Sequence, residues 1–323
     1  MSAVPSAQPL GGSRRLGDRI GDSALRGLTL AAAVAAVVLV GSIAYKVFDG
    51  AWPAITRYGL GFLVHVSWDP VKHAFAAGDF IFGTALTSFM ALLVAGPLSI
   101  AIGLYLSELA PRGVRGAIAT LVELLAAIPS VVLGLWGIVV LGPFVQDHLG
   151  PWLHSALGFL PFFSGDPHSA GSSMLTAVLV LTIMVVPISA SVCRELFLGV
   201  PNELEEGALA LGATRWEMVR GVVLPYTRSG VAAALILGLG RAIGEAIAVT
   251  QVIGAGYGIH WSLFQTGDTL ASRIASEYQG ASSADLTSAL VYLAAILLVI
   301  SVIVNFAAQL IVRRFEFQRA GGT

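Results

Sequence analysis

Charged side chains are scarce in this sequence. Only 11% of its 323 residues are Asp, Glu, Lys or Arg, and 56% are hydrophobic, whereas soluble domains carry about 25% charged residues. So few charges cannot cover the surface of a soluble protein of this length, which excludes a soluble domain. The composition instead predicts an all-α, polytopic membrane protein surrounded by membrane lipid.

Cysteine and basic runs are also nearly missing. Cys193 is the single cysteine, so no internal disulfide can form. The net charge is −1 and no Lys/Arg-rich run carries interleaved aromatic residues, which excludes nucleic acid as a partner. The histidines show no metal-ligand spacing, and we predict no metal site for them: His65, His73, His148, His154, His168 and His260.

Lysine is rarer still, and its absence bears on nucleotide binding. The two lysines, Lys46 and Lys72, do not follow glycine, so the phosphate-binding loop G-x-x-x-x-G-K-[ST] is missing. The chain therefore cannot bind ATP in that way. We predict a transport component that binds no cofactor and is not an enzyme by itself.

Long apolar runs are what the sequence has in abundance. A membrane-spanning helix needs about 20 predominantly apolar residues, and six runs meet that length. A transmembrane domain at 27–312 is therefore predicted between an N-terminal tail (1–26) and a C-terminal tail (313–323). The predicted spans are 27–48, 80–107, 117–142, 173–193, 229–255 and 286–312.

The positive charges predict the orientation of these spans. With the N-terminus inside, 13 of the 18 Lys and Arg residues fall in inner segments and four in outer ones: Lys46, Arg57, Lys72 and Arg273. Arg241 lies within the fifth run. Because cytoplasmic loops carry the excess of positive charge, both termini are predicted to be cytoplasmic.

The outer segments are predicted to be loops. WDP at 68–70 and the Gly-, Pro- and Ser-rich stretch 158–173 mark loop rather than strand, and no sheet is predicted elsewhere. Four tryptophans fit an aromatic belt at the membrane interface: Trp52, Trp68, Trp152 and Trp261.

Residues 201–225 form a charged, helix-patterned segment between the fourth and fifth spans. Pro201-Asn202 followed by acidic residues predicts a capped helix start. Gly212 interrupts the apolar pattern, which indicates two short helices joined at a turn. Pro225 can open the next helix, because its missing N–H is not needed in a first turn. The alternative is an interfacial loop lying on the lipid headgroups.

Arg241 and Glu245 are ionisable residues inside the fifth predicted span. Such groups are costly in a bilayer and are therefore usually functional. Being four apart, they share one face of a helix and can pair, and an arginine fork suits an oxyanion. Nearby Gly238, Gly240 and Gly244 leave room for close backbone approach. The alternative is a neutralised pair that only holds two helices together.

The third predicted span holds two further candidates for the substrate pathway, Glu123 and Ser130. Pro129 frees a backbone carbonyl, and the Ser130 hydroxyl can donate a hydrogen bond. A break of this kind is tolerated where helices pack or line a cavity. For Glu123 a role in helix packing is the alternative.

The order of residues in the segment 201–225 resembles the EAA motif of ABC importer permeases. The matching residues are Glu206, Gly207, Ala208, Gly212, Leu224 and Pro225. Gly207 stands for the family's usual Ala, and Val222 for its usual Ile. The resemblance implies that this segment sits in a groove of an ATP-hydrolysing subunit and passes its motion to the membrane helices.

Four other stretches make nearly all of the chain from Gly27 onward resemble phosphate-specific importers, of the PstC type rather than the PstA type. They are FGTALTS at 82–88, PLSIAIGLYLSELAP at 97–111, AAIPSVVLGLW at 126–136 and GRAIGEAIAV at 240–249. The resemblance implies a type I ABC importer permease fold, with Arg241 and Glu245 implicated in phosphate passage.

The resemblance also implies partners, all at the inner membrane. These are a second permease of the PstA type, a dimer of ATP-binding subunits that use ATP and Mg, and an extracytoplasmic phosphate-binding protein. Import of sulfate, molybdate or phosphonate is the alternative within the class. Outside it stands an ion-coupled secondary transporter or channel with Arg241 and Glu245 as a relay, which would not need an EAA segment.

Overall fold

The computed structural model describes residues 16–167 and 171–320. The chain divides into two units between Asp49 and Gly50, within the first helix. The start of the predicted N-terminal tail (1–15), His168 and residues 321–323 lie outside the described residues.

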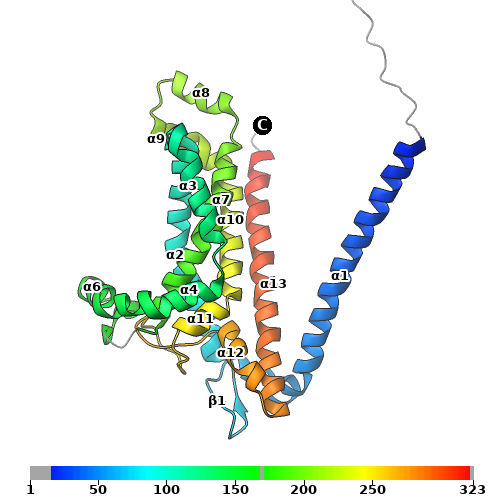
Figure 1. The fold of residues 1–323 in the computed structure, drawn as a ribbon, viewed down its shortest axis with the longest axis vertical. Coiled ribbons are helices and arrows are strands. Elements are labelled where there is room, and N and C mark those ends of the chain that lie inside the picture. Colours follow the sequence, from blue (N-terminus) through cyan, green and yellow to red (C-terminus); the bar gives the residue numbers. More distant parts are fainter. Residues whose placement is uncertain (1–15, 168–170, 321–323) are drawn as a thin grey trace, which may run out of the picture. The chain divides into compact units, whose positions relative to one another are not determined.

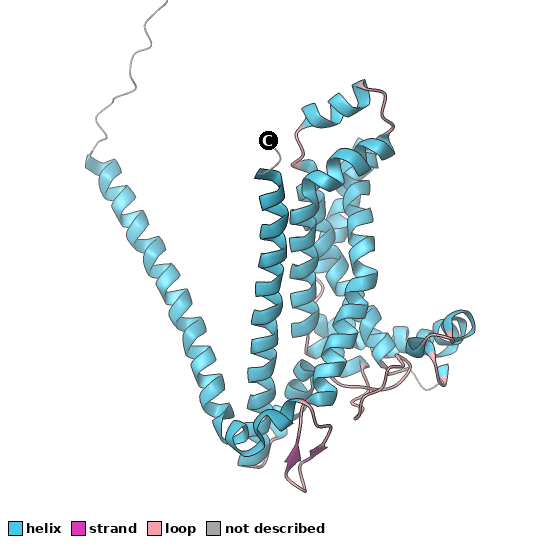
Figure 2. Ribbon diagram, turned by 180° about the vertical axis from the view of Figure 1, so that it is seen from behind, coloured by secondary structure: helices cyan, strands magenta, loops and turns pink. Residues whose placement is uncertain are grey.

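The described residues are mostly helical (Figure 2). The α-helices and strands, in chain order, are α1 Leu16–Tyr58, β1 Trp68–Asp69, β2 Ala74–Phe75, α2 Gly78–Leu104, α3 Arg112–Ala126, α4 Ser130–Trp136, α5 Gly142–Phe144, α6 Gly150–Leu157, α7 Met174–Leu198, α8 Asn202–Ala210, α9 Arg215–Met218, α10 Leu224–Gly244, α11 Ile247–Val252, α12 Leu270–Glu277 and α13 Ala284–Ala320. Shorter 3₁₀ turns occupy Gly59–Leu63, Pro161–Phe163 and Tyr278–Gly280, and wider π-type turns occupy Tyr105–Leu109, Gly137–Leu141, Val145–Leu149 and Val219–Val223.

Six helical stretches in the described part of the chain are long and apolar enough to cross a membrane. They are Gly21–Leu63, Gly78–Leu109, Ser130–Leu157, Met174–Leu198, Arg215–Gly244 and Ala284–Leu310. This confirms the predicted all-α fold with six spans.

Helix α7 is the centre of the second unit. Of the most apolar stretch of α7, 72% of residues are buried inside the protein. One face packs on α2 and another on α10, and α10 also contacts α13. The core between them is formed by apolar side chains of α2, α7 and α11, among them Ala91, Leu181 and Val252. A helix apolar on all sides is expected at such a buried position.

The two ends of the second unit differ (Figure 1). Helices α8 and α9 lie at the same end as the C-terminal end of α13, while α6, α12 and the β1–β2 hairpin lie at the opposite end. The segment 201–225 and the end of α13 are therefore on the same side of the unit. We call this side the α8 end.

The third predicted span has different limits in the structure. Helix α3 ends at Ala126 and α4 begins at Ser130, so the predicted span 117–142 is two helices. Pro129 cannot donate a backbone hydrogen bond and disfavours helical geometry at the residue before it, which ends α3. The long third span begins at Ser130 and continues to Leu157.

The fifth predicted span, 229–255, is also interrupted. Helix α10 ends at Gly244, Glu245 has an extended backbone (φ −75°, ψ 114°), and a separate short helix α11 starts at Ile247. Apolar character continues through the break, which is why hydropathy does not reveal it. At its other end this span begins at Arg215.

The predicted absence of strands at 68–70 was wrong. Trp68–Asp69 and Ala74–Phe75 form a two-stranded antiparallel hairpin. Trp68 is buried rather than exposed at a membrane interface, and its ring contacts those of Phe75 and Phe80. The exposed positions of Trp52, Trp152 and Trp261 agree with the predicted belt.

Candidate functional site

The turn between α8 and α9 is built around Gly212. Its φ of +91° lies in the left-handed region that favours glycine. The N–H of Gly212 donates to the carbonyl of Leu209 (3.0 Å), and the N–H of Ala213 donates to that of Ala208 (3.1 Å). These two bonds form a Schellman motif, which satisfies the last carbonyls of α8. Gly212 therefore sets the angle at which the chain leaves α8.

The start of α9 is held by a reciprocal cap. The Thr214 hydroxyl accepts from the N–H of Glu217 (3.3 Å), and the Glu217 carboxylate accepts from the N–H of Thr214 (2.8 Å). Such a capping box satisfies two free donors at once. The predicted cap at the start of α8 differs, because Pro201 is the N-cap residue and no side chain caps this end.

Helix α9 continues into the fifth span. A π-type turn at Val219–Val223 joins it to α10, so the helical run extends from Arg215 to Gly244. Pro225 lies in the first turn of α10, as predicted, but the π-type turn before it makes the helical run continuous. The wider π-type turn before Pro225 tolerates the missing N–H donor of proline. The half-buried Leu224 packs against the core beneath α9.

The segment 201–225 contacts the membrane helices on one side. Met218 and Val219 are buried against Cys193 and Phe197 of α7, and Ala208 packs on the same cluster. The Arg215 guanidinium donates to the carbonyl of Glu108 (3.2 Å), in the π-type turn that follows α2. A displacement of α8 and α9 would therefore act on α2, α7 and α10 together.

The opposite side of the segment is exposed. Glu206, Gly207, Leu211 and Trp216 all face outward, with Leu211 91% and Trp216 65% exposed. Burial raises the pKa of the neighbouring Glu205 carboxyl, and the nearby Glu108 carboxylate raises it further. Exposed large apolar side chains beside acidic groups are typical of a surface that binds another protein.

A pocket of about 520 Å³ opens where α10 ends. Arg241, Gly244 and Glu245 line it, together with Asn305 of α13 and the apolar Ile188 and Leu237. The structure thus brings Arg241 and Glu245 into one pocket. An arginine fork beside an amide side chain offers several N–H donors to an anion.

Arg241 and Glu245 do not form the predicted ion pair in the described part of the chain. The helix ends between them, so the four-residue helical spacing no longer holds. Glu245 instead accepts weakly from the N–H of Ala248 (3.4 Å) in the first turn of α11. The Arg241 guanidinium is therefore available to a ligand.

The glycines near Arg241 have two different roles. A side chain on Gly238 would meet Ser189 Oγ at 2.6 Å, so this glycine allows α10 to approach α7 closely. Gly240 and Gly244 have nothing within 4 Å and line the pocket. The predicted close approach therefore applies to Gly238 and not to the other two.

Glu123 and Ser130 are not part of the Arg241 pocket. Glu123 is exposed on α3, and Ser130 is half-buried in the first turn of α4. Neither lines any of the three described pockets. Their pathway role stays a prediction. Among the described residues, no three His, Cys, Asp or Glu side chains gather as a metal site would need.

A buried ionic cluster at the end opposite α8 was not predicted from the sequence. Arg273 is 3% exposed and forms ion pairs with Asp268 (2.7 Å) and Glu277 (2.6 Å). The guanidinium lies 4.8 Å from the ring centroid of Phe80 and 4.7 Å from that of Tyr257. Burial lowers the pKa of Arg273, but Asp268 and Glu277 outweigh it and raise the pKa above its usual value.

This cluster ties the surrounding loops together. The Trp68 indole donates to Glu277 (2.9 Å), and the N–H of Leu270 donates to the Thr84 hydroxyl (2.9 Å). The backbone of Gly83 lies against the Asp268 carbonyl, where any side chain would overlap. The FGTALTS stretch therefore serves to seat the loop before α12 on α2. The helical spacing of Arg273 and Glu277, four residues apart, is the local signal for this cluster. The two hydrogen bonds join residues 186 or more positions apart and have no such signal.

We expect Arg273→Met to destabilise the protein by about 3–5 kcal/mol, because it leaves Asp268 as an unpaired buried charge. Denaturant-induced unfolding of the purified protein in detergent measures this. Arg57→Met is the matched control, since the Arg57–Asp285 pair is exposed and exposed pairs contribute little. Equal stability of the two variants would contradict a structural role for the cluster.

A known protein family matches most of this chain. The family model described as "Binding-protein-dependent transport system inner membrane component" matches residues 95–317. This range includes the segment 201–225, Arg241 and Asn305. The chain belongs to this family. The predicted inner-membrane location and transport role of the chain are thereby confirmed.

Relatives of this inner membrane component match it over nearly its whole length. A protein of Mesorhizobium japonicum named phosphate transport system permease protein PstC is 40% identical over 324 residues, covering 98% of each chain. A Pasteurella multocida protein of the same name is 40% identical over 308 residues, covering 94% of this chain and 95% of its own. The predicted resemblance is confirmed.

Solved structures agree on the fold of this inner membrane component. A chain of a bacterial alginate ABC transporter, solved with its alginate pentasaccharide-bound periplasmic protein, has a TM-score of 0.57 and 20% identity, covering 93% of this chain and 98% of its own. A chain of the MetNI methionine ABC transporter has a TM-score of 0.55 and 20% identity, covering 73% and 94%. At this identity the likeness concerns the fold alone, and it confirms the predicted ABC importer permease fold.

Proposed function

We propose that this chain is the membrane-spanning permease subunit of an ATP-driven importer of inorganic phosphate. The observation that carries the proposal is the pocket at the end of α10, where Arg241 has no ion-pair partner among the described residues and lies beside the Asn305 amide. Full-length similarity to proteins named phosphate transport permeases supports phosphate as the anion.

Arg241 has the chemistry that an oxyanion requires. A planar guanidinium donates two parallel hydrogen bonds to phosphate oxygens, which lysine cannot do. Glu245 lies in the same pocket, where its negative charge weakens anion binding. A site in a transport pathway must bind firmly enough to admit the ion and weakly enough to release it. Glu245 would promote the release of phosphate by weakening its binding to Arg241.

Each end of the second unit would bind a different partner. A dimer of ATP-binding subunits, which use ATP and Mg, would dock on the exposed side of α8 and the turn at Gly212. A phosphate-binding protein would deliver its ligand at the opposite end, near α12 and the β1–β2 hairpin. A second permease of the PstA type would complete the pathway in a heterodimer. In this arrangement the α8 end and both termini are cytoplasmic.

ATP-driven motion would reach the pocket through a continuous helix. The run from Arg215 to Gly244 carries Trp216 at its docking end and Arg241 at its pocket end. Tilting this run at the α8 end moves Arg241 against α13. Access to the pocket can thus alternate between the two membrane faces.

Uptake of labelled phosphate and labelled sulfate by cells with and without this chain tests the proposal. We expect loss of the chain to remove phosphate uptake and to leave sulfate uptake unchanged. Loss of sulfate, molybdate or phosphonate uptake instead would assign another oxyanion. Phosphate uptake that depends on an ion gradient and not on ATP would indicate a secondary transporter or channel.

A further inference from the structure

Helix α13 carries a polar stripe that the pocket description does not explain. Ser301, Asn305 and Gln309 recur every four residues in a span whose most apolar 18 residues have a mean hydropathy of 2.7. Residues four apart lie on one face of a helix. Polar side chains are rare in such helices and usually face a cavity or a partner helix. The stripe therefore marks one side of α13 as different from the rest.

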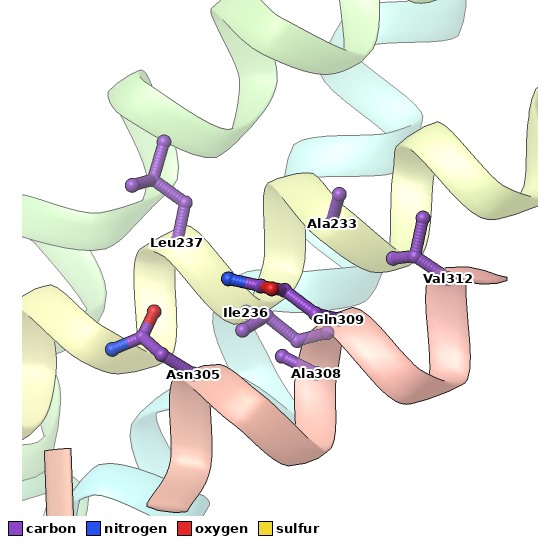
Figure 3. A pocket seen from close by; sticks show the side chains of 7 residues that line it. All are labelled: Ala233, Ile236, Leu237, Asn305, Ala308, Gln309 and Val312. Carbon is purple, nitrogen blue, oxygen red and sulfur yellow. The ribbon is translucent and has the colours of Figure 1, made fainter. Parts of the chain in front are cut away.

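The stripe faces a groove between α10 and α13. Asn305 lines the Arg241 pocket and also two adjoining pockets of about 380 and 590 Å³. Gln309 lines both of these, and Ser301 lines the larger one. Figure 3 shows Asn305 and Gln309 extending from α13 toward α10, where Leu237 and Ile236 lie. The three pockets share residues and so form one groove.

The groove leads from Arg241 toward the α8 end. Helices α10 and α13 pack side by side and run in opposite directions. On α10 the groove is lined by Arg241, then Leu237, then Ala233, toward the start of that helix. On α13 it is lined by Asn305 and then Gln309, toward the end of that helix. Both sequences of residues approach the end that carries α8 (Figure 1). The proposed function makes this the cytoplasmic end.

The amides offer weaker anion contacts than Arg241. The Asn305 amide nitrogen donates to the carbonyl of Ser301 (2.8 Å), which uses one of its two N–H groups. The second remains for a ligand, and Gln309 supplies another amide one turn further along. A neutral donor replaces part of the hydration of an ion without holding it as an opposite charge does. Successive amides after an arginine therefore lower the barrier to leaving it without forming a second tight site.

We propose that Asn305 and Gln309 form the exit path for phosphate between Arg241 and the α8 end. This inference rests on the proposed function and adds the route and residues of release. The groove admits the anion, the amides replace its water, and no cation lines the groove beyond Arg241 among the described residues. The alternative is that the stripe bonds to a helix of the partner permease.

The test is phosphate uptake into vesicles that contain the full complex with its ATPase subunits and binding protein. Asn305→Asp places a negative charge on the path at almost unchanged volume. We expect it to lower the initial uptake rate about tenfold or more, because like charges oppose passage. Asn305→Gln is the matched control that keeps the amide, and we expect it to retain most of the uptake. Both variants should give wild-type complex yield.

Gln309→Glu repeats the test nearer the α8 end, in case Asn305→Asp affects assembly. Wild-type uptake in both acidic variants would overturn the exit path. A fall in uptake that only matches a fall in complex yield in both variants would assign the stripe to helix association, which also overturns it. A wild-type complex that takes up no phosphate would instead reject the proposed function, so the two failures are distinguishable.

Discussion

Replacing Arg241 by alanine is expected to lower phosphate uptake between about 30-fold and several thousandfold. Arg241 is exposed in this chain alone, and the proposal requires that the pathway enclose it with the ion. Loss of an enclosed, hydrogen-bonded charge contact costs about 2–5 kcal/mol, and each 1.4 kcal/mol is about tenfold. Arg241→Lys should recover only part of the activity, because an ammonium group cannot donate two parallel hydrogen bonds in the guanidinium geometry. Uptake beside complex yield, in vesicles with the ATPase subunits, measures both effects.

The double variant Arg241→Gln with Glu245→Ala separates an anion site from a structural ion pair. If Arg241 only neutralised Glu245, removing both charges would restore uptake, since an unpaired charge is the costly state. Glu245 lies beyond the end of α10 and contacts the Ala248 N–H instead. We therefore expect the double variant to assemble normally and still to fail in transport. Full uptake by this variant would refute the anion role.

Gly212→Val is expected to uncouple the ATPase subunits from the membrane helices. A β-branched residue is strongly disfavoured at φ +91°, so the turn must change and α8 must reorient. No atom lies within 4 Å of the position that a side chain would take, so the effect comes from the backbone and not from crowding. We expect lost co-purification of the ATPase subunits and lost uptake, with the membrane helices still inserted.

Two matched controls isolate this effect. Gly212→Asn should retain most coupling, because asparagine tolerates the left-handed region better than other residues with side chains. Gly207→Ala should be neutral or slightly stabilising, because Gly207 lies inside α8 with open space around it and alanine favours helix. Normal co-purification and uptake in Gly212→Val would contradict the proposed role of the turn.

The sequence predicted the fold where the signal was local. Apolar runs revealed six spans, and the spacing from Glu206 to Pro225 placed a turn at Gly212, where the structure has a left-handed glycine. The break at Pro129 was predicted within one span, but the structure ends one helix there and starts another. The interruption at Glu245 was missed. Hydropathy reports that a segment suits lipid, and it is unchanged where a helix stops and restarts inside the membrane region.

The candidate site was predictable only in part. Arg241 stands out because a charge in an apolar run is rare, but its surroundings depend on residues distant in sequence. Asn305 joins the same pocket from another helix, and nothing near it in the sequence relates it to Arg241. The Arg273 cluster combines side chains of α2, the β1–β2 hairpin and α12. Only the tertiary fold places such groups together.

The most direct test of the account is ATP-driven accumulation of labelled phosphate in vesicles that contain this chain, its partner permease and the ATPase subunits, with the binding protein outside. We predict accumulation that requires ATP and phosphate-loaded binding protein, and its loss in Arg241→Ala while the ATPase subunits stay bound. Wild-type accumulation in Arg241→Ala, or accumulation without ATP, would contradict the account.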